Sequence, residues 1–271
     1  MDHMRIADPV HVTVTGPTCI GDERLTARQR AIVAAMAFHG DGGATTEVLV
    51  DVVWSGTAPK AARQSLQNQI TRLRRRFGED LIRTDPDGYR LRATTDVQRF
   101  EQVVGPRVHL PAAPDGIDAL SAALANWRGT PYADLVDFVP VEAERSRLVE
   151  LHARAQEHLA VCRLAAGDHG RAAVDLAALV GEDPYRERRW TLLVLAHHLA
   201  GRRADALAAY DRAEQCFEAD LRARPSLALT ALRDRIAAGE PVALGEIEAV
   251  VPPRIRGRAT RCRHRLVDRA S

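Results

Sequence analysis

The stretch that decides the fold is PKAARQSLQNQITRLRRRFG, residues 59–78, with LIRTDPDGYR, residues 81–90, shortly after it. Placed on a helix at about 100° per residue, residues 60–77 carry their apolar side chains on one narrow stripe. The stripe consists of Ala62, Leu66, Ile70, Leu73 and Phe77. Residues 60–76 also contain six basic side chains and no acidic one. The sequence therefore predicts a helix with one face buried against a core and a polar, positively charged opposite face.

The polar face of this helix carries amide, hydroxyl and guanidinium groups. These groups suit the base edges of a DNA major groove, because Arg pairs with guanine and Asn or Gln pairs with adenine. The residues that we expect to face bases are Gln64, Gln67, Asn68, Thr71 and Arg75. A solvated amphipathic helix has the same pattern, so the helix by itself leaves both interpretations open.

A predicted hairpin follows the helix. Two short β-prone runs, residues 81–83 and 89–91, flank a turn in which Pro86 presets φ and Gly88 accepts a positive φ. A basic helix followed by a hairpin is typical of a helix and wing, in which the hairpin contacts the DNA backbone or minor groove beside the helix. The side chains that we expect to hold phosphates are Lys60, Arg63, Arg72, Arg74, Arg83 and Arg90. The combination favours double-stranded DNA as the ligand.

Length and composition indicate two domains that are rich in helix. A chain of 271 residues is long enough for two domains. Its apolar residues are mostly Ala and Leu, and aromatic residues make up only 4%. The formal net charge of +2 by itself says nothing about nucleic acid. The distribution of charge along the chain is more informative about nucleic-acid binding, because positive charge is concentrated in residues 60–76 and at the C-terminus.

The cysteines and the N-terminus favour a soluble cytoplasmic protein. Cys19, Cys162, Cys216 and Cys262 lie far apart without a C-x-x-C pair, which favours reduced thiols over a disulfide framework or a zinc cluster. Residues 1–9 have no apolar signal region, and no uninterrupted apolar run reaches about 18 residues. We therefore expect no membrane segment.

The N-terminal signals complete a winged helix-turn-helix. Residues 11–15 alternate like a strand and open a small antiparallel sheet. Thr26-x-x-Gln29 is a capping box that opens a helix, and a second helix is expected at about residues 46–54. Strands, two helices, the basic helix and the hairpin predict an N-terminal winged helix-turn-helix with small antiparallel sheets over residues 1–95.

From Val97 onward the sequence predicts one helix after another. The expected helices are residues 97–104, 118–127, 141–166, 170–180, 185–200, 203–219 and 226–238, with a loop at 105–116. A repeat of 34 residues, typical of tetratricopeptide units, relates Gly167 to Gly201, Ala172 to Ala206 and Leu176 to Tyr210. A plain helical bundle remains the alternative. We expect a mainly α protein with an all-α tetratricopeptide-like domain over residues 96–240 and a basic, flexible tail over residues 241–271.

With these motifs placed, the sequence resembles the SARP-type antibiotic regulatory proteins, which pair an OmpR-like winged helix with a bacterial transcriptional activation domain. In the first domain the resemblance is carried by Arg28-Gln29-Arg30-Ala31, Glu47-x-Leu49-x-Asp51-x-x-Trp54, Arg63-x-x-Leu66-Gln67 and Gly88-Tyr89-Arg90-Leu91. In the second it is carried by Arg99-Phe100-Glu101, Trp127-Arg128-Gly129, Glu144-Arg145, Pro184-x-Arg186-Glu187 and Gly201-Arg202-x-Ala204-Asp205-Ala206.

The resemblance implies a transcriptional activator of a specialised-metabolite, or antibiotic, biosynthesis gene cluster. Members of this family bind direct repeats in promoters as paired copies and contact RNA polymerase. The resemblance therefore implies promoter DNA and RNA polymerase holoenzyme as partners, with self-association on DNA. It also implies a bacterial cytoplasmic protein that joins the nucleoid when bound.

The sequence gives no sign of an enzyme. It lacks the patterns G-x-x-x-x-G-K-[ST], G-x-G-x-x-G, H-E-x-x-H and G-x-S-x-G, so no catalytic residue and no cofactor is expected. His197-His198 lies in an apolar helix, and Cys262-x-His264 lacks two further ligands. We therefore expect no metal site.

Two functions remain to be compared. The first is a sequence-specific DNA-binding activator. The second is an adaptor whose helical repeats bind proteins and whose winged helix serves protein contact. The polar face of residues 64–75, together with Arg83 and Arg90, favours the first. Salt dependence separates the two, because a DNA binder loses affinity at a log–log slope of about −0.9 per phosphate neutralised.

Overall fold

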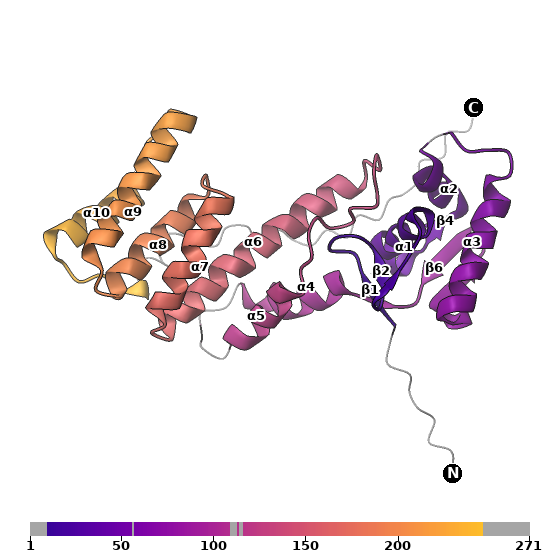
Figure 1. Ribbon diagram of the computed structural model, residues 1–271, viewed down its shortest axis with the longest axis horizontal. Coiled ribbons are helices and arrows are strands. Elements are labelled where there is room, and N and C mark those ends of the chain that lie inside the picture. Colours follow the sequence, from indigo (N-terminus) through magenta and orange to yellow (C-terminus); the bar gives the residue numbers. More distant parts are fainter. Residues whose placement is uncertain (1–9, 56, 109–112, 114–115, 246–271) are drawn as a thin grey trace, which may run out of the picture.

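The computed structural model describes residues 10–55, 57–108, 113 and 116–245. The molecule is elongated, with the strands at one end, the last helices at the other and the long helix α6 (Val141–Ala165) running between them (Figure 1). The predicted Arg-rich tail, with Cys262 and His264, falls almost entirely in residues 246–271, outside the described residues. Among the described helices, none combines the length and the apolar character needed to cross a membrane.

The first sheet brings together strands from the start and the end of the winged-helix part. β1 (His11–Thr13), β2 (Cys19–Ile20) and β3 (Glu23–Arg24) form the antiparallel sheet that the sequence predicts. β7 (Thr94–Thr95) then pairs with β1 in parallel. Because β7 follows the wing in the chain, this pairing places the start of the helical part beside the N-terminal strand.

The starts of the first two helices are fixed by their own caps. The Thr26 capping box before α1 (Ala27–His39) is confirmed, because the Thr26 N–H donates to Gln29 Oε1 over 3.1 Å and the Gln29 N–H donates to Thr26 Oγ1 over 3.4 Å. The Thr45 hydroxyl accepts from the backbone at the start of α2 (Thr46–Trp54). Both helices therefore lie where the sequence predicts them.

The basic helix is α3 (Ala62–Phe77), which begins two residues after the predicted start at Lys60. The intervening residues form a turn in which the Ala62 N–H donates to the Pro59 carbonyl over 2.9 Å. The predicted stripe is confirmed as the buried face of α3, made of Ala62, Leu66, Ile70 and Leu73, with Phe77 partly buried. This stripe joins the core that contains α1 and α2, which leaves the opposite face to solvent.

The predicted hairpin is formed by β5 (Ile82–Asp85) and β6 (Gly88–Leu91), and β4 (Ala44–Thr45) pairs with the other edge of β6. The expectation of a positive φ at Gly88 is wrong, because its backbone is not in the left-handed region. A Cβ at Gly88 would lie only 2.1 Å from the carbonyl oxygen of Ala44. Glycine is needed here because β4 passes so close to β6.

The first helix of the helical part is longer than predicted. α4 (Asp96–Arg107) continues through Gly105-Pro106, where the sequence predicts a loop. The Val108 N–H donates to the Val104 carbonyl over 3.1 Å, and both valines are buried with Phe100. The burial of this extra turn outweighs the poor helix propensity of glycine and proline.

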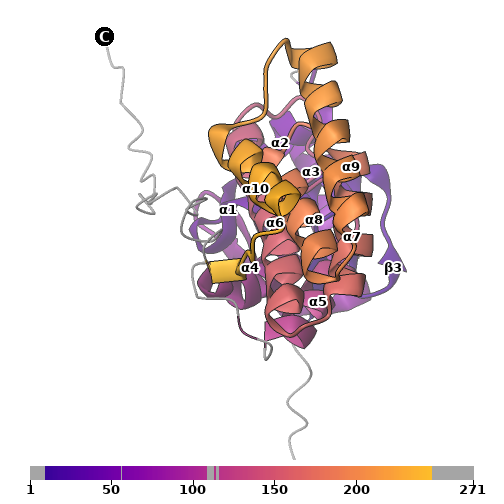
Figure 2. The same ribbon diagram turned by 90° about the vertical axis from the view of Figure 1, so that its left-hand side faces the viewer.

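The remaining α-helices are α5 (Ile117–Ala125), α7 (His169–Glu182), α8 (Glu187–Leu199), α9 (Arg203–Cys216) and α10 (Leu227–Ala238). Helices α7 to α10 lie stacked against one another (Figure 2). The repeat-related Ala172 and Ala206 are both fully buried. Gly167 and Gly201 follow α6 and α8 with φ values of 80° and 73°. Residues that the 34-residue repeat relates therefore also share their burial or their backbone conformation.

The helix predicted to reach residue 219 changes type before its end. α-Helical hydrogen bonding stops at Cys216, and a π-helical turn covers Phe217–Leu221. Phe217 is buried in the core of the α7–α10 stack.

A charge cluster fixes α8 against α6. Glu157 is only 3% exposed, and its Oε1 accepts from Arg186 Nε over 2.8 Å. Arg186 Nη1 also donates to Glu150 over 2.7 Å. The Pro184-x-Arg186-Glu187 motif therefore places a guanidinium that bonds two acids of α6.

Residues 126–140, between α5 and α6, form the junction between the winged helix and the helical part. Pro131 makes an antiparallel bridge with Thr15, and the Tyr132 N–H donates to the Val14 carbonyl over 2.6 Å. The Tyr132 side chain is 4% exposed and belongs to the same core as α1, α2 and α3. The segment therefore extends the first sheet and anchors the helical part to it.

An ion pair adds to this junction. Arg30 Nε of α1 donates to Asp134 Oδ1 over 2.7 Å, and the Thr18 N–H donates to Asp134 Oδ2 over 2.7 Å. One carboxylate thus connects α1, the turn before β2 and the junction segment.

Asp96, the first residue of α4, connects α4 to the N-terminal strand. Its carboxylate accepts from the backbone N–H groups of Val14 and Thr15 over 2.8 Å and 3.0 Å, and also from the Thr15 hydroxyl. It accepts from the Val97 N–H over 2.9 Å as well. Asp96 is only 7% exposed, so water cannot solvate its charge. These hydrogen-bond donors take the place of that water.

Asp96→Ala leaves the buried donors of Val14 and Thr15 without this acceptor. Each unsatisfied buried group costs about 1–3 kcal/mol, so we expect the free energy of unfolding to fall by at least about 2 kcal/mol. Asp96→Asn should cost less, because the amide keeps one acceptor oxygen. Urea denaturation followed by circular dichroism measures both changes. An alanine variant as stable as the wild type would contradict the assigned role.

His152 of α6 is held in its neutral form. Its ring stacks on Trp127 with 4.4 Å between the centroids. Burial, and secondly the positive charge of Arg189, lower the pKa of His152 from 6.5 to about 4. The unfolded chain therefore binds more protons than the folded chain between these two pH values.

The stabilising effect of a neutral His152 is fully present above about pH 6.5 and is lost as the pH falls toward about 4. We expect His152→Phe, which keeps an aromatic ring on Trp127, to weaken the pH dependence of the unfolding free energy between about pH 7 and pH 5. Urea denaturation of both proteins at several pH values in this range is the measurement. Identical slopes would show that His152 does not titrate as assigned.

Candidate nucleic-acid interface

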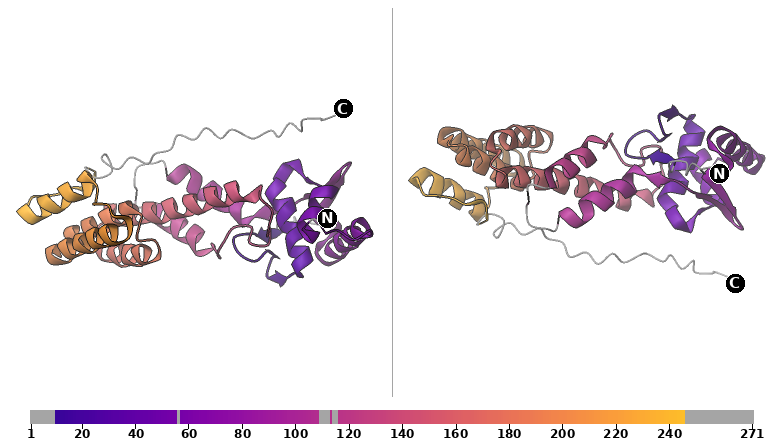
Figure 3. Two further views of the ribbon diagram at one scale, coloured as in Figure 1. Left: turned by 90° about the horizontal axis from the view of Figure 1, so that it is seen from above. Right: turned by 90° about the horizontal axis from the view of Figure 1, so that it is seen from below.

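The predicted base-facing residues share the solvent side of α3. Gln64, Gln67, Asn68, Thr71 and Arg75 are all exposed. The buried stripe fixes the rotation of the helix, so these five side chains cannot turn toward the core. α3 lies at the outer end of the molecule, far from α10 (Figures 1 and 3). A long ligand therefore reaches this face without meeting the helical stack.

Arg74 holds α3 to the wing. Its Nε and Nη2 donate to the Ile82 carbonyl over 3.0 Å and 2.7 Å, and Nη2 also donates to Thr84 Oγ1 over 2.8 Å. The sequence predicts a phosphate contact for Arg74 but does not predict these hydrogen bonds to β5. They set the position of the helix relative to the hairpin.

The other predicted phosphate ligands of the helix are exposed. Arg63 pairs with Glu47 of α2 over 2.7 Å, with both side chains mostly in water. An ion pair of this kind contributes little stability and exchanges readily. Lys60 and Arg72 are exposed, and neither makes an ion pair within the described residues. The three cations lie before and along α3.

The wing arginines are partly neutralised by one acid. Arg90 pairs with Asp85 over 2.8 Å, and Arg83 pairs with the same carboxylate over 3.4 Å. Arg83 is exposed, whereas Arg90 is half-buried. The wing therefore presents less free positive charge than its arginines suggest.

Two contacts of this region have no signal in the sequence. Arg76, at the end of α3, pairs with Glu23 of β3 and donates to the Arg24 carbonyl. Trp54 is only partly buried, and the Arg28 guanidinium lies 5.7 Å from its ring centroid. Both contacts join residues that are distant in the chain, so local patterns do not reveal them.

The part of the chain that the structure describes contains no cluster of His, Cys, Asp and Glu arranged to hold a metal ion. Cys19 and Cys216 carry thiols that are not part of a disulfide. His197 sits in α8, where burial lowers its pKa. The candidate site is therefore a surface of hydrogen-bond donors and acceptors and positive charge.

A family model described as the bacterial transcriptional activator domain matches residues 95–237, more than half of the chain. The transcriptional regulatory protein EmbR of Mycobacterium tuberculosis is 34% identical over 247 residues, which cover 86% of this chain and 63% of EmbR. The transcriptional regulator RedD of Streptomyces coelicolor is 27% identical over 251 residues, covering 86% of this chain and 72% of RedD.

A solved structure of Mycobacterium tuberculosis EmbR, in complex with a low-affinity phosphopeptide, has the same architecture. Its TM-score is 0.77 at 30% identity, over 89% of this chain and 69% of the EmbR chain. The chain thus spans less than two thirds of the full length of EmbR. The regulatory protein AfsR of Streptomyces coelicolor is 30% identical over 82% of this chain but only 23% of AfsR.

The family match, the relatives and the structure agree with one another. The chain belongs to the SARP-type transcriptional regulators that carry a bacterial transcriptional activator domain, a family of regulators rather than enzymes.

Proposed function

We propose that this regulator is a sequence-specific DNA-binding activator of a specialised-metabolite biosynthesis gene cluster. The observation that carries the proposal is the single solvent face on α3 that holds two glutamines, an asparagine, a threonine and an arginine. Amide and guanidinium groups on one rigid helix match the hydrogen-bonding edges of bases. Within this proposal, residues 1–95 bind DNA and residues 96–240 activate transcription.

The dimensions of α3 suit a major groove. Its 16 residues span about 24 Å, and a groove about 12 Å wide accepts an α-helix. With the stripe of Leu66, Ile70 and Leu73 against the core, Asn68 and Thr71 point outward at the middle of the exposed face. These central residues would meet base edges first, and Gln64, Gln67 and Arg75 would extend the contact along the groove.

Phosphate contacts would set the register of the helix. Lys60, Arg63 and Arg72 offer exposed cations before and along α3, and Arg83 offers one on the wing. Such contacts add affinity without regard to sequence. Arg74 would contribute mainly by holding the wing beside the helix, since its guanidinium already bonds the backbone of β5.

Direct repeats would bind two copies on one face of the DNA. Half-sites about 10–10.5 bp apart, or a multiple of this, present the same groove to each copy. We place the contact between neighbouring copies in residues 97–238, and we place RNA polymerase binding on the same helical part. The cytoplasm, at the nucleoid, is the proposed location.

The division of roles on α3 is tested with two variants of exposed residues. We expect Asn68→Ala to change the ranking of DNA sequences, with a loss of about 1–3 kcal/mol on the preferred site. Arg72→Ala should weaken binding to all sequences alike and reduce the salt slope by about 0.9. Binding titrations with a set of site variants at several salt concentrations measure both. Arg212→Ala, an exposed arginine on α9, is the control.

An unchanged ranking of sites with Asn68→Ala would show that this residue does not face bases. A wild-type protein without any salt-dependent binding to DNA would favour the adaptor function instead.

A further inference from the structure

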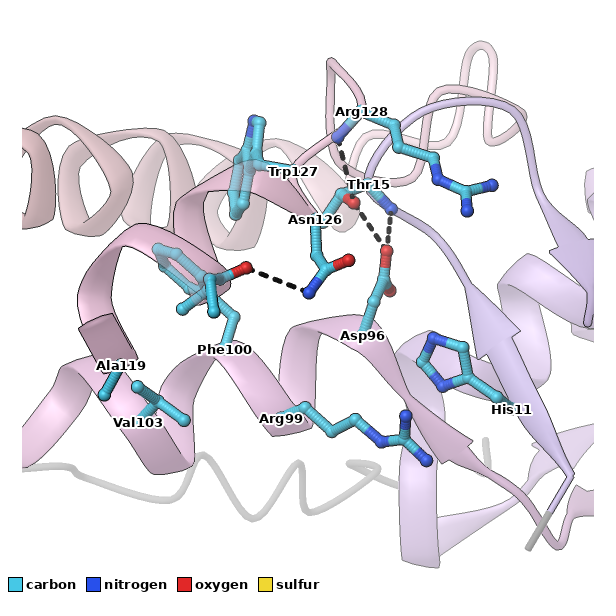
Figure 4. Close-up of a pocket in the computed structure, with 12 residues that line it drawn as sticks. His11, Thr15, Asp96, Arg99, Phe100, Val103, Ala119, Asn126, Trp127 and Arg128 are labelled. Atoms are coloured by element: carbon cyan, nitrogen blue, oxygen red, sulfur yellow. Dashed lines mark hydrogen bonds between the residues drawn. The ribbon is translucent and has the colours of Figure 1, made fainter. Parts of the chain in front are cut away.

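A cavity of about 400 Å³ lies where the N-terminal strand meets the first helices of the helical part (Figure 4). This volume is in the range of about 300–1,000 Å³ that is usual for small-molecule sites. The lining residues come from β1 and the residues after it, from α4 and α5, and from the residues that follow α5. None of the described lining residues belongs to α3 or the wing, so the cavity lies apart from the proposed DNA contacts.

One wall of the cavity is aromatic and apolar. Phe100 of α4 and Trp127 have ring centroids 5.0 Å apart, and Val103 and Ala119 continue the wall. Trp127 is also stacked on His152, on the side of α6. Because Phe100 and His152 both pack against the Trp127 ring, the wall is preformed for a flat apolar group.

Two arginines give the cavity a positive rim. Arg99 and Arg128 are both exposed lining residues, and within the described part of the chain neither guanidinium has a carboxylate partner. Arg128 Nη1 has only a weak contact, 3.8 Å from Cys19 Sγ. Figure 4 shows Arg99 extending toward His11, and Arg128 on the other side of Asp96, extending along the residues that follow β1. Two unpaired guanidinium groups beside an apolar wall favour a ligand with an acidic group.

Asp96 is the one acid among the described lining residues, and it does not neutralise this rim. Its two oxygens are occupied by donors from Val14, Thr15 and Val97. Its remaining negative charge still opposes a second charge on a ligand. The site therefore suits a singly charged carboxylate better than a doubly charged phosphate.

We propose that this cavity binds a small aromatic carboxylate. The aromatic body lies against Phe100 and Trp127, and the carboxylate accepts hydrogen bonds from Arg99 and Arg128. The ligand then contacts β1 and α4 at the same time, beside the Asp96 link. Binding therefore stabilises the junction of the winged helix and the helical part.

Isothermal titration calorimetry of the full chain with 1-naphthoate, and with the uncharged 1-naphthamide, tests the site without DNA. We expect one naphthoate per chain and at least tenfold weaker binding of the amide. The double variant Arg99→Gln with Arg128→Gln should lose at least tenfold in naphthoate affinity. Ala122→Phe, which adds a ring at an exposed lining position, should also block binding. Arg212→Gln on α9 is the matched control and should bind as the wild type does.

The substituted residues are exposed, so the variants should fold, and thermal melting followed by circular dichroism verifies this. No binding of naphthoate at millimolar concentration would overturn the proposal. Equal affinities for the acid and the amide, or for the wild type and the double arginine variant, would overturn it too. Since no DNA is present, these outcomes leave the proposed DNA binding unaffected.

Discussion

The carboxylate of Asp96 accepts hydrogen bonds from the backbone of Val14 and Thr15, more than eighty positions earlier in the chain. This buried charge joins the N-terminal strand to the first helix of the helical part. The junction segment then adds Tyr132 to the core of the winged helix, and Arg30 pairs with Asp134. Moving β1 away from α4 would leave the buried N–H groups of Val14 and Thr15 without this acceptor, so such a displacement is costly. The two parts are therefore joined by backbone hydrogen bonds, a shared core and an ion pair.

The position of the DNA-facing surface depends on two further constraints. The buried stripe of α3 fixes the rotation of the helix, and Arg74 fixes the helix to β5 through the Ile82 carbonyl. One guanidinium thus has a structural role at the edge of a surface where Lys60, Arg63 and Arg72 remain exposed to water. A structural arginine and a ligand-binding arginine look identical in a sequence, and only the partner distinguishes them.

Elements with a strong local signal were predictable from the sequence. The apolar stripe of α3, the Thr26 capping box and the 34-residue repeat depend on side chains a few positions apart or on a regular period. Contacts between distant residues were not predictable. The requirement for glycine at position 88 comes from Ala44 on another strand, and the extension of α4 comes from the burial of Val108. The exposed face of α3 was predictable for the same reason as its stripe, whereas the bonds of Arg74 and the cavity beside Trp127 arise only from the assembled fold.

The central claim is that α3 reads a DNA sequence, and unbiased selection of DNA sites by the purified full chain tests it most directly. At about 150 mM salt, where weak non-specific binding is suppressed, the claim predicts enrichment of a direct repeat with half-sites about 10–10.5 bp apart or a multiple of this. Recovery of no preferred sequence, with only weak and salt-sensitive binding, would contradict it. The helical part would then be the place to look for the function of the protein.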